Sequence, residues 1–180
     1  MTSRAMDYFY FFAGYFRSRP FHNSPELQSF VRETIFKRGI KTFFETGTYR
    51  GDTLRWVTKQ DIRLRCLSVE SKRLYYQLAA LRFRNEAVIF GESDKVLPKV
   101  LPYLAEPVLF WLDAHCGSVS PYPLKAELDA IKRSTKRCLI IVDDYNDPEI
   151  AKDVEKPDTV LGWERDGRAH MVAVMDWMGA

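Results

Sequence analysis

The chain has 180 residues, of which 46% are hydrophobic and 28% are charged, and its formal net charge is only +3. These values are typical of one soluble globular domain. The small net charge and the lack of a long basic run argue against nucleic-acid binding. No segment is long enough to span a bilayer, and no signal peptide is recognisable. We therefore expect a cytoplasmic protein without a transmembrane segment.

The first 23 residues are predicted to be an aromatic N-terminal extension, and residues 24–180 to be the domain itself. The extension contains the run "YFYFFAGYF" (Tyr8 to Phe16). An exposed apolar stretch of this kind usually has a partner. A lid, a homodimer contact and a membrane-surface patch all fit this run.

A first helix is predicted from Ser24-Pro25-Glu26, which combines an N-cap hydroxyl, a proline at the first position and an acid in the first turn. Gly39 is expected to end it. Apolar runs then predict strands at 40–45, 64–70, 87–93, 107–114 and 137–144. Helical spacing predicts helices at 52–59, 71–83, 94–104 and 123–134, of which the third is made irregular by Pro98 and Pro102.

Strands that alternate with helices predict an α/β protein with a doubly wound, mostly parallel sheet. The last segment has a different pattern. Two apolar runs, 158–164 and 169–178, flank Asp166-Gly167, which is a hairpin turn signal. The sheet is therefore expected to end in an antiparallel hairpin.

Three cysteines with no close pairing argue against a disulfide framework. Cys66 and Cys138 lie in apolar runs and are expected to pack in the core. Cys116 lies next to His115, but neighbouring side chains usually point apart and no glycine elbow surrounds the pair. A Cys–His nucleophile is therefore disfavoured.

Four of the predicted parallel strands end in acidic residues. They are Glu45, Glu70, Asp113 and the pair Asp143-Asp144. The carboxyl ends of parallel strands lie on one edge of a sheet, which is where ligands bind in doubly wound folds. The alternative is that each acid only caps the helix that follows it.

The segment "ETGTYRGDT" (Glu45 to Thr53) contains two glycines four residues apart. Gly47 and Gly51 are expected to let the backbone approach a ligand closely. Glu70 is placed to accept hydrogen bonds from a ribose diol. A nucleoside-type cofactor is the prediction. A nicotinamide enzyme is the competing interpretation, but it favours G-x-G-x-x-G, which is lacking here.

These segments resemble the class I S-adenosylmethionine-dependent methyltransferases, and most closely the catechol and macrolide-sugar O-methyltransferases. Residues 45–53 follow the pattern E-x-G-x-Y-x-G-x-[ST], and Glu70 stands where that family holds the ribose. Residues 91–94 match its adenine-side loop, and "WLDAH" (111–115) and "IIVDDYND" (140–147) match the acids after strands four and five. The resemblance covers about residues 40–178 and implies a Rossmann-like, seven-stranded sheet. The implied S-adenosylmethionine-binding residues are Glu45, Gly47, Thr48, Tyr49, Gly51, Thr53, Glu70, Glu92, Ser93 and Asp113.

In the resembling O-methyltransferases the acids after strands four and five bind a divalent cation. The resemblance therefore implies a metal site of Asp113, Asp143 and Asp144, with Mg²⁺ or Mn²⁺ as the ion. Such an ion acts as a Lewis acid that lowers the pKa of a hydroxyl group. The alternatives are that Asp113 orients the substrate directly and that Asp144 only caps the next turn.

His115, two residues after Asp113, is a candidate catalytic base at neutral pH, and Asp113 is the second candidate catalytic residue. Tyr122 is a candidate for the acceptor pocket. The expected reaction is methyl transfer to a hydroxyl oxygen of a small molecule such as a sugar, a diol or a natural product. The alternative function is a non-catalytic module that binds a nucleoside cofactor. Because the resembling enzymes carry longer N-terminal helices, the pocket is expected to be open or completed by a partner chain.

Overall fold

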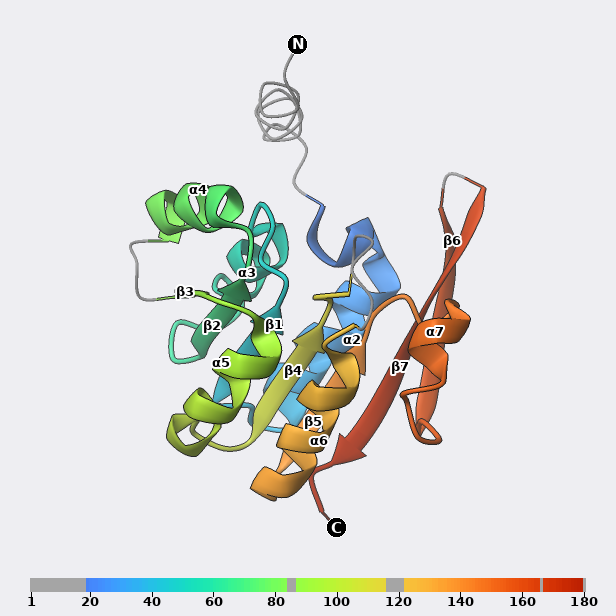
Figure 1. Cartoon of the computed structure of the whole chain (residues 1–180). Helices are drawn as coiled ribbons and strands as arrows, with labels where there is room; N and C mark the ends of the chain where they lie inside the picture. The colour runs from blue at the N-terminus through green and yellow to red at the C-terminus, as the bar shows by residue number, and fades with distance from the viewer. Residues whose placement is uncertain (1–18, 84–86, 116–121, 166, 180) are drawn as a thin grey trace.

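The computed structural model describes residues 19–83, 87–115, 122–165 and 167–179. Its centre is one seven-stranded sheet with the strand order β3-β2-β1-β4-β5-β7-β6 (Figure 1). The strands are β1 (Thr42–Thr46), β2 (Arg65–Glu70), β3 (Val88–Phe90), β4 (Val108–Leu112), β5 (Cys138–Val142), β6 (Thr159–Arg165) and β7 (Arg168–Trp177). The first five pair in parallel, and β7 is antiparallel to both β5 and β6.

Helices cover both faces of the sheet (Figure 1). The helices are α2 (Pro25–Lys37), α3 (Asp52–Val57), α4 (Arg73–Phe83), α5 (Ser93–Val100), α6 (Leu124–Ser134) and α7 (Pro148–Ala151), with short 3₁₀ turns η1 (Pro20–Asn23) and η2 (Leu101–Tyr103). Side chains of α2, α3 and α4 pack with one set of strand residues, and side chains of α5, α6 and α7 pack with the other. Alternating burial on the two faces thus gives a three-layer α/β/α sandwich.

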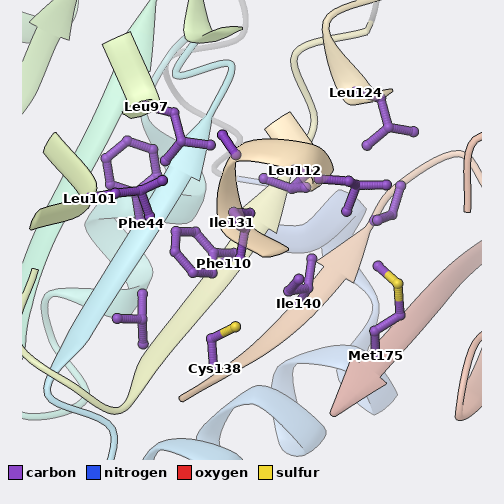
Figure 2. Close-up of a cluster of buried hydrophobic side chains, with 14 of the residues drawn as sticks. Phe44, Leu97, Leu101, Phe110, Leu112, Leu124, Ile131, Cys138, Ile140 and Met175 are labelled. Atoms are coloured by element: carbon purple, nitrogen blue, oxygen red, sulfur yellow. The ribbon is translucent and has the colours of Figure 1, made fainter. Parts of the chain in front are cut away.

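Continuous apolar strands explain why the sheet is buried on both faces. All five residues of β4 and all five of β5 are buried, as is usual for parallel strands between two helical layers. Figure 2 shows the core on the α5–α6 side, where Phe44 and Phe110 of the strands lie among Leu97 and Ile131 of the helices. Cys138 lies in this core, as predicted, and Cys66 is half-buried. Cys116 is outside the described residues.

The predicted fold class is confirmed: the sheet is doubly wound, mostly parallel and seven-stranded, and it ends in an antiparallel hairpin. The register of β6 and β7 brings Arg165 opposite Arg168, so the chain reverses between these two residues. Asp166, the first residue of the predicted turn signal, is outside the described residues. Helix α5 continues through Pro98, and Pro102 lies in η2, so the irregularity falls at the second proline. Among the described helices, none has the length and apolar character needed to cross a membrane.

Residues 20–23, which the sequence assigned to the N-terminal extension, pack into the domain. Phe21 is 1% exposed and meets the rings of Trp56 and Trp111 edge-on at centroid distances of 5.5 and 5.0 Å. Its backbone N–H donates to the hydroxyl of Thr53 at 3.2 Å. The core therefore begins before the predicted boundary at residue 24. The aromatic run from Tyr8 to Phe16 is outside the described residues.

Candidate functional site

The strand order reverses between β1 and β4, since β2 and β3 lie on one side of β1 while β4 and β5 lie on the other. The carboxyl ends of these strands lie along one edge of the sheet (Figure 1). This is the position at which doubly wound sheets bind ligands. The predicted acids of β1, β2, β4 and β5 all reach this edge or stand one residue before it.

The loop after β1 is held by its own backbone. The N–H of Gly47 donates to the carbonyl of Val69 at 2.9 Å. Gly47 has a φ of +87°, and a methyl group on it would lie 2.5 Å from the backbone oxygen of Asp113. Gly51 also has a positive φ, and a methyl group there would overlap the ring of Phe83. Both glycines are therefore required by the packing of the protein itself, in addition to any role towards a ligand.

Glu70 ends β2 beneath this loop. Its carboxylate accepts hydrogen bonds from the backbone N–H groups of Tyr49 and Lys72, both at 2.7 Å. Lys72 stands just before α4, so this bond holds the turn that leads into the helix, and a capping role for Glu70 stays an alternative. Burial raises the pKa of Glu70, and these backbone donors oppose the shift. A carboxylate offers about four acceptor positions, so lone pairs remain for ribose hydroxyls.

Glu45 lies inside β1 and is 2% exposed. It accepts a hydrogen bond from the hydroxyl of Ser68 at 2.6 Å, and that hydroxyl also contacts Thr48 at 2.6 Å. Burial raises the pKa of Glu45 to about 8 against the effect of Ser68, so the carboxyl is protonated at neutral pH. These contacts support the loop from within; a direct contact between Glu45 and a cofactor stays a prediction.

The other predicted cofactor residues differ in exposure. Tyr49 is 44% exposed and has a φ of +47°. Ser93 is buried at the start of α5, whereas Glu92 before it is exposed and pairs with Lys95. Thr53 is occupied by the N–H of Phe21. The exposed ring of Tyr49 is therefore accessible to a ligand, whereas Ser93, Glu92 and Thr53 make contacts within the chain.

The acids after β4 and β5 meet two histidines. Ligand atoms of His22, Asp113 and Asp143 all lie within 4.8 Å of one another. A second group of Asp113, His115 and Asp144 meets the same limit. In the described part of the chain, the predicted triple of Asp113, Asp143 and Asp144 is thus divided between two groups that share Asp113. Each group has the kind of donors that hold a divalent ion.

His22 is the site residue that sequence reasoning missed. Its Nε2 atom contacts a carboxylate oxygen of Asp143, 121 positions away in the chain. Its ring also stacks on His170 of β7 at a centroid distance of 5.8 Å, and His170 stacks on Trp163 of β6 at 5.6 Å. No pattern around "PFHN" indicates this position, because the contact depends on the tertiary fold.

His115 is 5% exposed, and neither of its ring nitrogens has a hydrogen-bond partner among the described residues. Burial lowers its pKa, and the carboxylates of Asp143 and Asp144 oppose the shift only in part. The backbone of Asp143 also opposes the lowering of this pKa, although it makes no hydrogen bond of normal geometry to the ring. The ring of Tyr122 meets His115 at a centroid distance of 6.2 Å, so the predicted pocket residue is next to the candidate base.

Asp143 and Asp144 have different environments. Asp143 is 1% exposed, while Asp144 is half-buried with a φ of +51°. Burial and then the charge of Asp143 raise the pKa of Asp144. The side chain that caps α7 is Asp147, which accepts from the N–H of Glu149 at 2.9 Å. A turn does follow Asp144, whose backbone carbonyl accepts from the N–H of Asp147 at 2.8 Å, and a capping role for the Asp144 side chain stays an alternative.

Glu127 of α6 is a second buried acid that the sequence did not single out. It is fully buried, and neither carboxylate oxygen makes a hydrogen bond of normal geometry in the described structure. Burial raises its pKa to about 7, and the hydroxyls of Ser93 and Thr46 lie close enough to oppose the shift. Thr46 in turn accepts from the N–H of Asp113 at 3.3 Å. Glu127 therefore lies under the strand ends that carry the site.

Solved structures of methyltransferases share the fold of this chain. The O-methyltransferase from Bacillus cereus, solved with S-adenosylhomocysteine, has a TM-score of 0.59 and 17% identity over 85% of this chain and 82% of that one. TomG from Streptomyces achromogenes, an O-methyltransferase involved in tomaymycin synthesis and solved with S-adenosylmethionine, has a TM-score of 0.56 and 18% identity over 85% and 81%. The chain has the class I methyltransferase fold.

The class I methyltransferase fold was the expectation from the motifs, and it is confirmed. DesVI from Streptomyces venezuelae matches 97% of this chain and 70% of its own, with a TM-score of 0.53 and 14% identity. No protein-family model matches the sequence, and no curated protein matches it significantly. The likeness is therefore one of fold, and the activity has to be argued from the site.

Proposed function

We propose that the protein is an S-adenosylmethionine-dependent O-methyltransferase that acts on a hydroxyl group of a small molecule such as a sugar, a diol or a natural product. The observation that carries the proposal is the position of Glu70. Its buried carboxylate is fixed by two backbone N–H groups at the edge where the strand order reverses, beside the glycine loop. A ribose diol is the ligand that this geometry fits.

The proposed cofactor would supply a methyl group that is bonded to a sulfonium sulfur. Once the methyl group is transferred, the sulfur is the thioether of S-adenosylhomocysteine. The chain's residues bind and orient the two reactants. Glu70 and the loop at Gly47 hold the nucleoside, and Ser93 faces its adenine side. In the reaction the hydroxyl oxygen forms a bond to the methyl carbon, and the bond from that carbon to sulfur breaks. A fixed near-attack geometry can supply several kcal/mol of the barrier reduction.

The proton of the acceptor hydroxyl leaves on the side of the site that carries the acids after β4 and β5. His115 is the proposed base, because its ring is buried near Asp113 and neither ring nitrogen has a hydrogen-bond partner among the described residues. The carboxylates of Asp113 and Asp143, with His22, suit a divalent ion, and such an ion when bound lowers the pKa of the acceptor hydroxyl. A module that only binds a nucleoside has no need of these histidines and acids together.

The proposal is tested first by calorimetry. S-adenosylhomocysteine is expected to bind with micromolar affinity, and NAD is expected not to bind. Release of S-adenosylhomocysteine from S-adenosylmethionine is then measured with a panel of catechols, sugars and other diols, with EDTA and with Mg²⁺ or Mn²⁺. Binding of NAD without binding of S-adenosylhomocysteine would remove the proposal. Cofactor binding without turnover on any acceptor would favour the non-catalytic module.

A further inference from the structure

Two histidines from distant parts of the chain meet the acids at the ends of β4 and β5. His22 comes from η1, before the first strand, and its Nε2 atom contacts Asp143. Its donor atom lies within 4.8 Å of those of Asp113 and Asp143. These residues are buried or half-buried. Nitrogen and oxygen donors therefore meet where the motifs indicated carboxylates alone.

His115 gives independent evidence that this cluster receives a ligand. The residue is only 5% exposed, and both ring nitrogens lack a hydrogen-bond partner within the described residues. One of them lies within 4.8 Å of carboxylate oxygens of Asp113 and Asp144. Buried polar groups in native proteins are nearly always satisfied by protein, water or an ion. An ion or a water held in the cluster around Asp113 would supply this ring with a partner.

The position of His22 is fixed by the core. Phe21 before it is fully packed between Trp56 and Trp111. Ser24 after it caps α2 by accepting from the N–H of Leu27 at 3.1 Å. His22 itself has a φ of +52°, in the left-handed region. The imidazole is thus presented to Asp143 by a rigid segment that is anchored on both sides.

The donor set decides which ion fits. Sites of carboxylates and water suit Mg²⁺, whereas an imidazole nitrogen suits first-row transition ions. We propose that His22, Asp113 and Asp143 form one cation site, and that this site takes a divalent transition ion such as Mn²⁺ or Co²⁺ in preference to Mg²⁺. The inference rests on the proposed function, since this ion would stand beside the acceptor hydroxyl. It departs from the carboxylate-only site that the motifs implied.

Metal binding itself is the test, and it needs no acceptor. The chain has three histidines, so an untagged protein allows each nitrogen ligand to be assigned. Co²⁺ is titrated by its visible absorption, and Mn²⁺ and Mg²⁺ are titrated by calorimetry. We expect one equivalent of Co²⁺ or Mn²⁺ to bind at least about tenfold more tightly than Mg²⁺. Electron spin-echo spectra of bound Mn²⁺ are expected to show coupling to a ¹⁴N nucleus.

His22→Asn is the informative variant, because asparagine tolerates a left-handed φ and cannot replace the imidazole nitrogen. Mutation of a residue that only hydrogen-bonds to a metal ligand typically lowers metal affinity by about 10–100-fold. Loss of a ligand itself is therefore expected to weaken Co²⁺ binding by at least about 100-fold. The ¹⁴N coupling is expected to disappear. His22→Gln is the second variant if the first does not fold by circular dichroism. The matched control is His170→Asn, which removes the ring stacked on His22 and is expected to change Co²⁺ affinity by less than about threefold.

Equal Co²⁺ affinity in His22→Asn and the unaltered protein would overturn the inference. Binding of Mg²⁺ as tight as that of Co²⁺, or no binding of either ion, would also overturn it. A parallel titration with S-adenosylhomocysteine separates the two proposals. If the nucleoside binds and the transition ion does not, only the metal inference fails. If the ion binds and the nucleoside does not, only the methyltransferase proposal fails.

Discussion

A methyl group on Gly47 would lie 2.5 Å from the backbone oxygen of Asp113 and 3.0 Å from its carbonyl carbon. The glycine loop after β1 and the acidic end of β4 are therefore in direct backbone contact. This contact joins the cofactor half of the site to the acidic half.

Gly47→Ala is expected to disturb both halves at once. The added methyl group forces the backbone of β4 to move, and alanine is strained at a φ of +87°. We expect a loss of roughly 2–4 kcal/mol in the free energy of unfolding, measured in urea. Gly39→Ala is the control, because Gly39 also has a positive φ but a methyl group placed on it would meet nothing within 4 Å. If both variants lose the same stability, the contact with Asp113 has no energetic importance.

Phe21→Ala is expected to destabilise the domain, although residue 21 lies before the first predicted helix. The side chain is 1% exposed and is held by two tryptophan rings. Removal of a buried phenylalanine ring typically costs about 3–5 kcal/mol. Urea denaturation, followed by tryptophan fluorescence, measures the loss. Phe36→Ala is the control, since Phe36 is 55% exposed and its loss is expected to change stability by less than about 0.5 kcal/mol. A small effect at Phe21 would mean that η1 is not part of the cooperative core.

Glu45 should make the protein less stable as the pH rises. Burial raises its pKa to about 8, from an ordinary value of 4.5, so the folded state binds more protons than the unfolded state between these values. The free energy of unfolding therefore falls as pH increases from about 4.5 to about 8. Glu127, with a pKa of about 7, acts in the same direction over a narrower range.

Glu45→Gln is expected to flatten this fall, because glutamine carries no proton that can be lost. The gain at pH 8 is on the order of 4 kcal/mol at most. Urea denaturation at several pH values is the measurement, and a residual slope below about pH 7 is expected from Glu127. Glu33→Gln, on the exposed face of α2, is the control and should leave the slope unchanged. An unaltered slope in Glu45→Gln would show that another group carries the pH dependence.

The sequence predicted the fold because its signals are local. Each apolar strand run is followed by a polar turn and a helical repeat, and Asp166-Gly167 indicates the hairpin directly. The acids at the strand ends could also be assigned to one edge, since parallel strands end together. These features need only the order of elements and the geometry of a parallel sheet.

The contacts that complete the site could not be predicted in this way. His22 reaches Asp143 across 121 positions through a segment with three successive left-handed residues, Phe21, His22 and Asn23. Nothing in "PFHN" indicates that conformation, because left-handed non-glycine residues are uncommon. The burial of Glu127 could not be predicted from the sequence either, since an acid on an amphipathic helix normally faces water. Tertiary packing determines both.

Glu70→Ala is expected to weaken S-adenosylhomocysteine binding by about 1.5–3 kcal/mol, the range for hydrogen bonds that involve a charged group. The loss has two sources, namely the ribose contact and the bond that fixes the N–H of Tyr49. Calorimetry measures it. Glu92→Ala is the matched comparison, because Glu92 is exposed and pairs with Lys95, and its effect is expected to stay below about 1 kcal/mol. Equal losses would mean that the adenine-side loop contributes as much as the ribose side.

His115→Ala is expected to lower turnover by roughly 10²–10⁴-fold, the usual contribution of a positioned acid or base. The ring is buried beside the acidic cluster, its nitrogens have no hydrogen-bond partner in the described structure, and the ring of Tyr122 lies next to it. S-adenosylhomocysteine affinity should barely change, because the ring lies with the acids after β4 and β5, whereas Glu70 ends β2 on the other side of β1. Initial rates with the best acceptor from the panel measure the effect, and calorimetry checks the cofactor.

His170→Ala is the control for His115→Ala, since it removes a histidine near Asp144 that belongs to neither ligand group. Its turnover should fall much less, because the ring of His170 stacks on Trp163 and His22 at the side of the cluster. If His115→Ala retains full turnover, the proton of the acceptor leaves by another route. The lowered pKa of the hydroxyl at the cation site would then be its only activation.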